Sequence, residues 1–214
     1  VKDMDTAVRL SENRQGKKTV ALVGMSPLSC AMSPFYDDME IAPFGDYVEI
    51  WSMNETHAFK FMKRATRWFQ IHINYAQKVA KRGVREHYEW LQKNPWGIPI
   101  YMISPQKDIP KSQAYPLEIV CTLLDGVRRG EDRVKYFNSS FDYMMGLAIL
   151  EKYERVEVYG FDMAGDNEFA IQKPSAEFWI GLAVGRGIEI YLPPECMLLK
   201  SNLYGGMEQG EGWQ

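Results

Sequence analysis

The stretch NSSFDYMMGLAILEKYERVEVYGFDMAGD, residues 138–166, decides the fold class of this chain. Nearly every residue from Phe141 to Leu150 is apolar, which predicts a helix covered on several sides, with Ser139 or Ser140 capping its first turn. Charged residues then bring the chain to the surface, and VEVY at 156–159 predicts a core strand that ends at Gly160. A buried helix followed at once by a buried strand is typical of a parallel α/β sheet.

Short apolar runs elsewhere extend the predicted sheet. TVALV at 19–23, closed by Gly24, predicts the first strand. The other predicted strands are residues 47–51, 67–71, 98–102 and 188–192, and the other predicted helices are residues 58–65, 75–92, 117–128 and 175–186. Residues 104–116 form a predicted loop that is long enough for a lid.

The sequence therefore predicts one α/β domain, a single Rossmann-like domain whose mainly parallel, twisted sheet carries helices on both faces. We place this domain at residues 19–200. A polar N-terminal leader at 1–18 precedes it, and a flexible tail at 201–214, rich in glycine and acidic residues, follows it.

Composition and charge argue against several classes of protein. Hydrophobic residues make up 46% of the 214 residues and charged residues 25%, as in ordinary soluble globular proteins. The net charge of -3 gives no electrostatic reason to expect non-specific binding to nucleic acid or membranes. Three cysteines without C-x-x-C spacing predict neither a disulfide framework nor a zinc site and favour a reducing, cytoplasmic setting. No apolar run approaches the about 20 residues of a membrane-spanning helix.

Polar side chains follow the predicted strands at their carboxyl ends, where parallel sheets bind ligands. These residues are Ser26 and Ser29 after the first strand, Asn54 and His57 after the second, Gln70 and His72 after the third, and Asp162 after residues 156–159. The hydroxyl and backbone N–H groups of residues 24–29 suit a phosphate, although Ser and Pro in a tight turn explain that segment equally well. Asp162 has a second interpretation, because a carboxylate just past a strand often accepts backbone N–H bonds.

Residues 20–27, 50–55, 139–163 and 188–199 resemble, in this order, the bacterial sialyltransferases of glycosyltransferase family 42. They also resemble a broader set of Rossmann-like proteins, some of which act in pterin diphosphate chemistry. The resemblance implies a cytidine nucleotide held by the loop after the first strand, by polar residues after the second and third strands, and by a serine at the buried helix. The matching residues here are Met25, Ser26, Pro27, Asn54, Gln70 and Ser140, with Ser139 beside Ser140.

The chain also departs from the family pattern. The first loop has Met-Ser-Pro-Leu where the family has Asn-Gly-Pro-Ser, and the two tyrosines that assist the leaving group fall near Ala164 and Phe169. The family's general-base histidine falls near Gln172, which we expect to contact substrate but which cannot usefully accept a proton. We expect His72 to be the base, with His57 as second choice and Asp162 as the fallback.

The expected function is metal-independent glycosyl transfer from a nucleotide-activated sugar, which would be a substrate and not a cofactor. No metal motif is found in the sequence apart from one Asp-x-Asp in the leader. A Rossmann-like protein that binds nucleotides or transfers or hydrolyses pyrophosphate without sugar transfer is the alternative, as is a non-catalytic binding module. The sequence does not identify the acceptor of the sugar, and it is compatible with a homo-oligomer.

Overall fold

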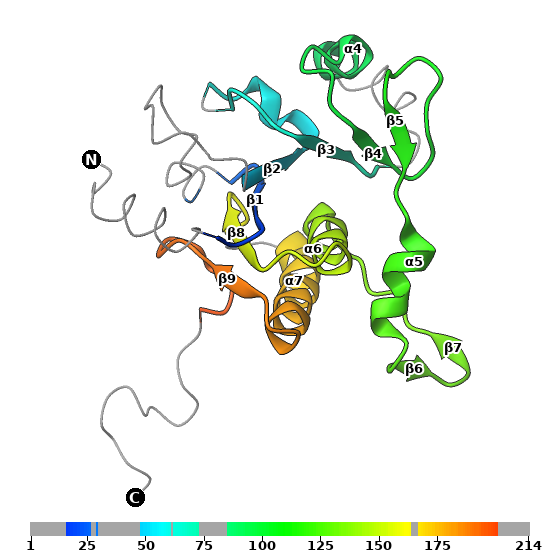
Figure 1. The fold of residues 1–214 in the computed structure, drawn as a ribbon, viewed down its shortest axis with the longest axis vertical. Coiled ribbons are helices and arrows are strands. Elements are labelled where there is room, and N and C mark those ends of the chain that lie inside the picture. Colours follow the sequence, from blue (N-terminus) through cyan, green and yellow to red (C-terminus); the bar gives the residue numbers. More distant parts are fainter. Residues whose placement is uncertain are drawn as a thin grey trace, which may run out of the picture.

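A seven-stranded sheet, parallel at every pairing, forms the centre of the molecule (Figure 1). The computed structural model describes residues 16–26, 29, 48–60, 62–72, 85–163 and 167–200. The strands are β1 (Thr19–Val23), β2 (Val48–Met53), β3 (Arg67–Gln70), β4 (Ile100–Met102), β5 (Ser112–Ala114), β8 (Arg155–Tyr159) and β9 (Glu189–Tyr191). Their order across the sheet is β5-β4-β3-β2-β1-β8-β9, so the predicted Rossmann-like sheet is confirmed.

The centre of the sheet contains a topological switch point. The chain leaves β1 toward β2 on one side, whereas it leaves β8 toward β9 on the other side. Val23 at the end of β1 is paired with Ser52 in β2 and with Tyr159 in β8, so the carboxyl ends of these three strands are level. Loops that diverge from adjacent strand ends leave a crevice between them, which is where open α/β sheets bind ligands.

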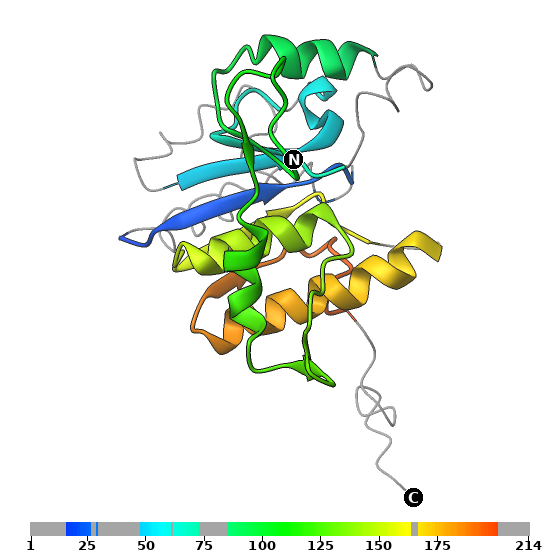
Figure 2. The same cartoon turned by 90° about the vertical axis from the view of Figure 1, so that its right-hand side faces the viewer.

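Helices lie on both faces of the sheet, as the sequence predicts. α6 (Ser140–Leu150) and α7 (Asn167–Gly185) cover one face, and α4 (Arg85–Lys93) with the 3-10 helix η1 (Asn54–Ala58) lies over the other (Figures 1 and 2). Alternate residues of β1 divide between two cores: Val20 and Leu22 pack on the α6 side, and Ala21 and Val23 on the α4 side. All four are fully buried, because a central parallel strand has no solvent-facing side.

α6 is the buried helix expected from residues 138–166. Its residues from Phe141 to Ile149 are buried except for Tyr143. At Gly146 an added Cβ would lie 2.7 Å from a methyl carbon of Val120, so only glycine allows α6 to approach α5 (Leu117–Cys121) this closely.

Four sequence predictions of secondary structure are wrong in their bounds or type. Residues 104–116 contain the edge strand β5, which the sequence does not predict because Ser-Gln-Ala is polar and not β-branched. Residues 58–65 do not form a helix in their described part: η1 ends at Ala58 and Phe59 is extended. A segment of about eight residues is too short to be a stable helix by its own propensity. Residues 117–128 break into α5, the 3-10 helix η2 (Thr122–Leu124) and the hairpin strand β6 (Arg128–Arg129), which pairs with β7 (Asp132–Arg133).

The fourth difference is the start of α7, which lies eight residues before the predicted start at Ser175. The predicted helix begins after Pro174 because proline usually interrupts a helix, but here the helix continues through it. Residues 75–84 of the predicted long helix, residues 1–15 of the leader and the tail at 201–214 lie outside the described residues. No helix in the described part is both long and apolar enough to cross a membrane.

Candidate functional site

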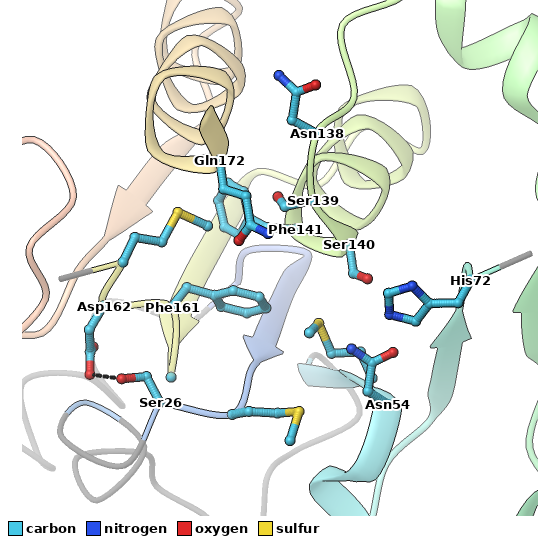
Figure 3. A pocket seen from close by; sticks show the side chains of 14 residues that line it. Ser26, Asn54, His72, Asn138, Ser139, Ser140, Phe141, Phe161, Asp162 and Gln172 are labelled. Atoms are coloured by element: carbon cyan, nitrogen blue, oxygen red, sulfur yellow. Dashed lines mark hydrogen bonds between the residues drawn. The ribbon is translucent and has the colours of Figure 1, made fainter. Parts of the chain in front are cut away.

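A pocket of about 540 Å³ lies at the carboxyl edge of the sheet, over the switch point between β1 and β8 (Figure 3). It is lined by Met25, Ser26, Met53, Asn54, His72, Asn138, Ser139, Ser140, Phe141, Gly160, Phe161, Asp162, Met163 and Gln172. These residues come from the ends of β1, β2, β3 and β8, from the amino end of α6, and from α7. The fold therefore brings segments that are far apart in the sequence to one concave site.

The loops after β1 and β8 form one wall of the pocket and are joined closely. Gly24 N donates to Tyr159 O at 2.8 Å, and Ser26 N donates to Gly160 O at 2.9 Å. The Asp162 carboxylate oxygen Oδ2 accepts the hydroxyl of Ser26, and it also accepts the backbone N–H of Ser29 at 3.2 Å. One oxygen of the Asp162 carboxylate therefore fixes the loop, in agreement with the second interpretation of this residue.

The other oxygen, Asp162 Oδ1, is buried and has no hydrogen-bond partner among the described residues. The residue is only 1% exposed and its side chain lines the pocket. A buried acceptor without a partner costs free energy, so this oxygen is suited to receive a donor from a ligand.

Asn54 lines the pocket from the first position of η1. Its backbone has φ 49°, the left-handed region that a non-glycine residue adopts at a cost. Asn54 is 8% exposed, and its Oδ1 atom also lacks a partner in the described part of the chain. Hydrogen bonds between Thr56 and Ser52 (2.6 Å) and between Ser52 and Val23 O (2.9 Å) anchor η1 to the ends of β2 and β1.

The amino end of α6 forms a third wall, where Ser139 is the N-cap residue and Ser140 the first helical residue. Beneath them, the Asp142 carboxylate accepts the backbone N–H groups of Asn138 (2.6 Å) and Ser139 (2.9 Å) and the Ser175 hydroxyl (2.9 Å). Burial raises the pKa of Asp142 from 3.8 to about 6, although these hydrogen bonds act in the opposite direction.

His72 and Gln172 complete the pocket on the sides of β3 and α7. His72 is exposed to solvent. In Figure 3 the side chains of Asn54, His72 and Ser140 gather at one end of the pocket, Ser26 and Asp162 lie together at the other, and the Phe161 ring stands between them. The pocket thus has two polar ends that are separated by an apolar wall.

The structure does not bring His57 and Gln70 to the lining of the pocket. His57 Nε2 lies 2.7 Å from Nδ1 of His87, and Nε2 of His87 lies 2.9 Å from Oε1 of Gln70. Burial lowers the pKa of His57 to about 4. His57 therefore belongs to a separate buried cluster, and Pro27 lies outside the described residues.

Six lining residues were not among the residues that we selected from the sequence as substrate-binding or catalytic: Met53, Asn138, Phe141, Gly160, Phe161 and Met163. The last three flank the selected Asp162 at the end of β8. Met53 is the last residue of β2, and its position at the carboxyl end of a strand was a signal for it in the sequence. Asn138 directly precedes the predicted N-cap, and this position next to a helix start indicated that it could lie at the site. Phe141 carried no signal, because an apolar residue in a buried helix is expected to be core.

No group of three or more His, Cys, Asp or Glu side chains in the described segments is arranged to hold a metal ion. The polar contacts available to a ligand are instead hydroxyl, amide, imidazole, carboxylate and backbone groups. Such a set can hold a nucleoside and its phosphate through hydrogen bonds.

The fold is similar to that of the sialyltransferase CstII from Campylobacter jejuni, solved in complex with a substrate analogue, cytidine-5'-monophosphate. The TM-score is 0.51 and the sequence identity 15%, and the match covers 85% of this chain and 82% of that chain. Protein-family models and curated protein sequences give no match to the chain. The structural likeness therefore confirms, at the level of the fold, the remote resemblance to bacterial sialyltransferases.

Proposed function

We propose that this chain is a transferase that binds a nucleotide-activated sugar in the pocket over β1 and β8 and transfers the sugar to an acceptor. The observation that carries this proposal is the convergence of the β1, β2 and β8 ends and the α6 amino end on one pocket, in a fold similar to that of a sialyltransferase solved with cytidine-5'-monophosphate (CMP). Most of the substrate-binding residues expected from the sequence line this pocket.

The two unpartnered acceptor atoms suggest how the nucleoside is held. Asp162 Oδ1 and Asn54 Oδ1 are buried, so each gains most from a ligand group that donates a hydrogen bond. A nucleoside offers such donors in its ribose hydroxyl groups and in an exocyclic amino group. Met53, Phe161 and Met163 supply apolar surface for the remainder of the nucleoside.

The phosphate is proposed to lie against the amino end of α6. The Ser140 hydroxyl and the first backbone N–H groups of the helix can donate to phosphate oxygens, and the helix dipole favours a negative charge there. The backbone N–H of Met25 is a further candidate donor from the loop after β1.

His72 is the proposed general base. The acceptor hydroxyl oxygen bonds to the anomeric carbon as the bond from that carbon to the phosphate oxygen breaks. The hydroxyl proton passes to a ring nitrogen of His72, and the electron pair leaves with the nucleotide phosphate. His72 is preferred to Asp162, one of whose carboxylate oxygens is already engaged by Ser26 and Ser29.

The proposal is tested by titrating the protein with CMP and then assaying turnover of a CMP-linked sugar in the presence of EDTA. A ligand at about 100 times its Kd stabilises by about 2.7 kcal/mol, which raises Tm by about 5–10 °C for a chain of this size. Stabilisation by CMP with EDTA-resistant release of CMP from the donor supports the transferase. If neither CMP nor any other nucleoside phosphate stabilises the protein, the proposal is wrong.

A non-catalytic nucleotide-binding module is the second candidate. It is favoured by Gln172, which lines the pocket where the family resemblance would put the base histidine. If the protein binds CMP but releases no CMP from a CMP-linked sugar, either by transfer or by hydrolysis, the result would support this module.

A further inference from the structure

A chain of hydrogen bonds beside the pocket joins three separate segments through His87 of α4. Nδ1 of His87 lies 2.7 Å from Nε2 of His57 in η1, and Nε2 of His87 lies 2.9 Å from Oε1 of Gln70 at the end of β3. His87 is 3% exposed and Gln70 is fully buried. Water therefore has little access to replace these bonds, and each contributes to how the segments are held.

Ring stacking strengthens the same link between η1 and α4. The His57 ring lies parallel to Trp90, with centroids 4.3 Å apart and an interplanar angle of 4°. Burial lowers the pKa of His87 to about 3, assisted by the nearby His57 and His72. Both His57 and His87 are thus neutral near pH 7, as the chain of bonds requires, because each imidazole can then donate from one ring nitrogen and accept at the other.

Two of the joined segments carry pocket residues. η1 begins with Asn54, whose left-handed backbone (φ 49°) must be held by surrounding contacts because it is strained. Gln70 lies two residues before His72, which lines the pocket at the end of β3. None of His57, His87 and Gln70 lines the pocket itself.

We infer that His87 is a positioning residue for the pocket: by holding η1 through His57 and the end of β3 through Gln70, it sets Asn54 and His72 in their binding positions. The inference rests on the proposed function for its consequence in ligand binding, but the mechanical link can be measured without any ligand. The bonds to His57 and to Gln70 leave from different ring nitrogens of His87, so these two bonds can be broken separately.

Three substitutions separate the bonds. In His87→Asn the amide oxygen stands near the Nδ1 position and keeps the bond to His57, whereas in His87→Gln the amide stands near Nε2 and keeps the bond to Gln70. His87→Phe keeps the ring and removes both bonds. His57→Phe is a backup on a half-buried residue that retains stacking on Trp90. Tyr88→Phe is the matched control, because it removes the Tyr88 bond to Asp108 from the same helix without touching the His57–His87–Gln70 chain.

Hydrogen exchange of the free protein and titration with CMP are the two measurements. We expect His87→Gln and His57→Phe to speed exchange in residues 54–58, His87→Asn to speed it in residues 67–72, and Tyr88→Phe to do neither. His87→Phe should weaken CMP binding by about tenfold or more, the loss expected when a buried hydrogen-bond network is cut.

Equal exchange in His87→Phe and wild type would overturn the inference, as would a uniform rise over the whole sheet, which marks general destabilisation. Local loosening with unchanged CMP affinity would overturn it too, because η1 and β3 would then move without effect on the pocket. If the wild-type protein binds neither CMP nor any other nucleoside phosphate, the proposed function fails, and the exchange pattern alone decides whether His87 holds the two segments.

Discussion

Replacing Gly24 with alanine tests whether the ends of β1 and β8 must approach as closely as the structure shows. An ideal Cβ on Gly24 would lie 2.4 Å from the carbonyl oxygen of Gly160 and 2.9 Å from ring carbons of Phe161. Two backbone hydrogen bonds flank the contact, Gly24 N to Tyr159 O (2.8 Å) and Ser26 N to Gly160 O (2.9 Å). The collision is therefore with backbone that is held in place, and it can be relieved only by separating the two loops.

We expect Gly24→Ala to cost about 1–3 kcal/mol, as over-packed sites do. A mid-range cost of about 2 kcal/mol lowers Tm by about 4–8 °C in a chain of this length. The same displacement moves Ser26 and Phe161 in the pocket wall, so CMP affinity should fall together with stability.

Gly181→Ala is the control, because nothing lies within 4 Å of a Cβ added at Gly181 in α7. Removing glycine from a helix interior should stabilise by about 0.5–1 kcal/mol. Calorimetry and urea unfolding measure both variants. A Gly24→Ala protein with wild-type Tm and wild-type CMP affinity would refute the close-approach argument.

Three further predictions concern the pocket and its support. Asn54→Ala should weaken CMP binding more than tenfold with Tm within a few degrees of wild type, since it removes the unpartnered Oδ1 atom. A fall in Tm with unchanged affinity would mean that Asn54 stabilises the backbone of η1 and does not bind the ligand. His72→Gln should abolish most donor turnover while leaving CMP affinity intact, and full turnover across the pH range would exclude His72 as the base. Because the folded pKa of Asp142 is about 6 against 3.8 for the ordinary group, the folded protein binds this proton more tightly, and the stability it contributes is present at low pH and lost as pH rises through about 6. We therefore expect Asp142→Asn to gain stability relative to wild type as the pH rises: in urea titrations its free energy of unfolding minus that of wild type should increase by up to about 3 kcal/mol between pH 4 and 7.5. A difference that does not change with pH would contradict the raised pKa.

Local sequence patterns determined the central part of the fold. The apolar run of β1, the two valines of β8 and the apolar surface around α6 favour burial of these elements. The charged Arg155 and Glu157 of β8 are buried as an ion pair (2.8 Å). Glycines close both strands, and polar residues follow them. Because the carboxyl ends of parallel strands meet at one edge, the amino-acid sequence alone is enough to expect Ser26, Asn54, His72 and Asp162 at one site.

Elements that form only through contacts with neighbouring elements could not be predicted from the sequence. β5 has a polar sequence and is a strand only because β4 offers an open edge, and α7 runs through Pro174, which the sequence alone marks as a break. The pairing of His57 with His87, 30 residues apart, and of His87 with Gln70 could not be predicted from any spacing. Whether a histidine at a strand end serves as a base or as part of a buried hydrogen-bond chain is decided by which helix packs over it, and that packing exists only in the tertiary structure.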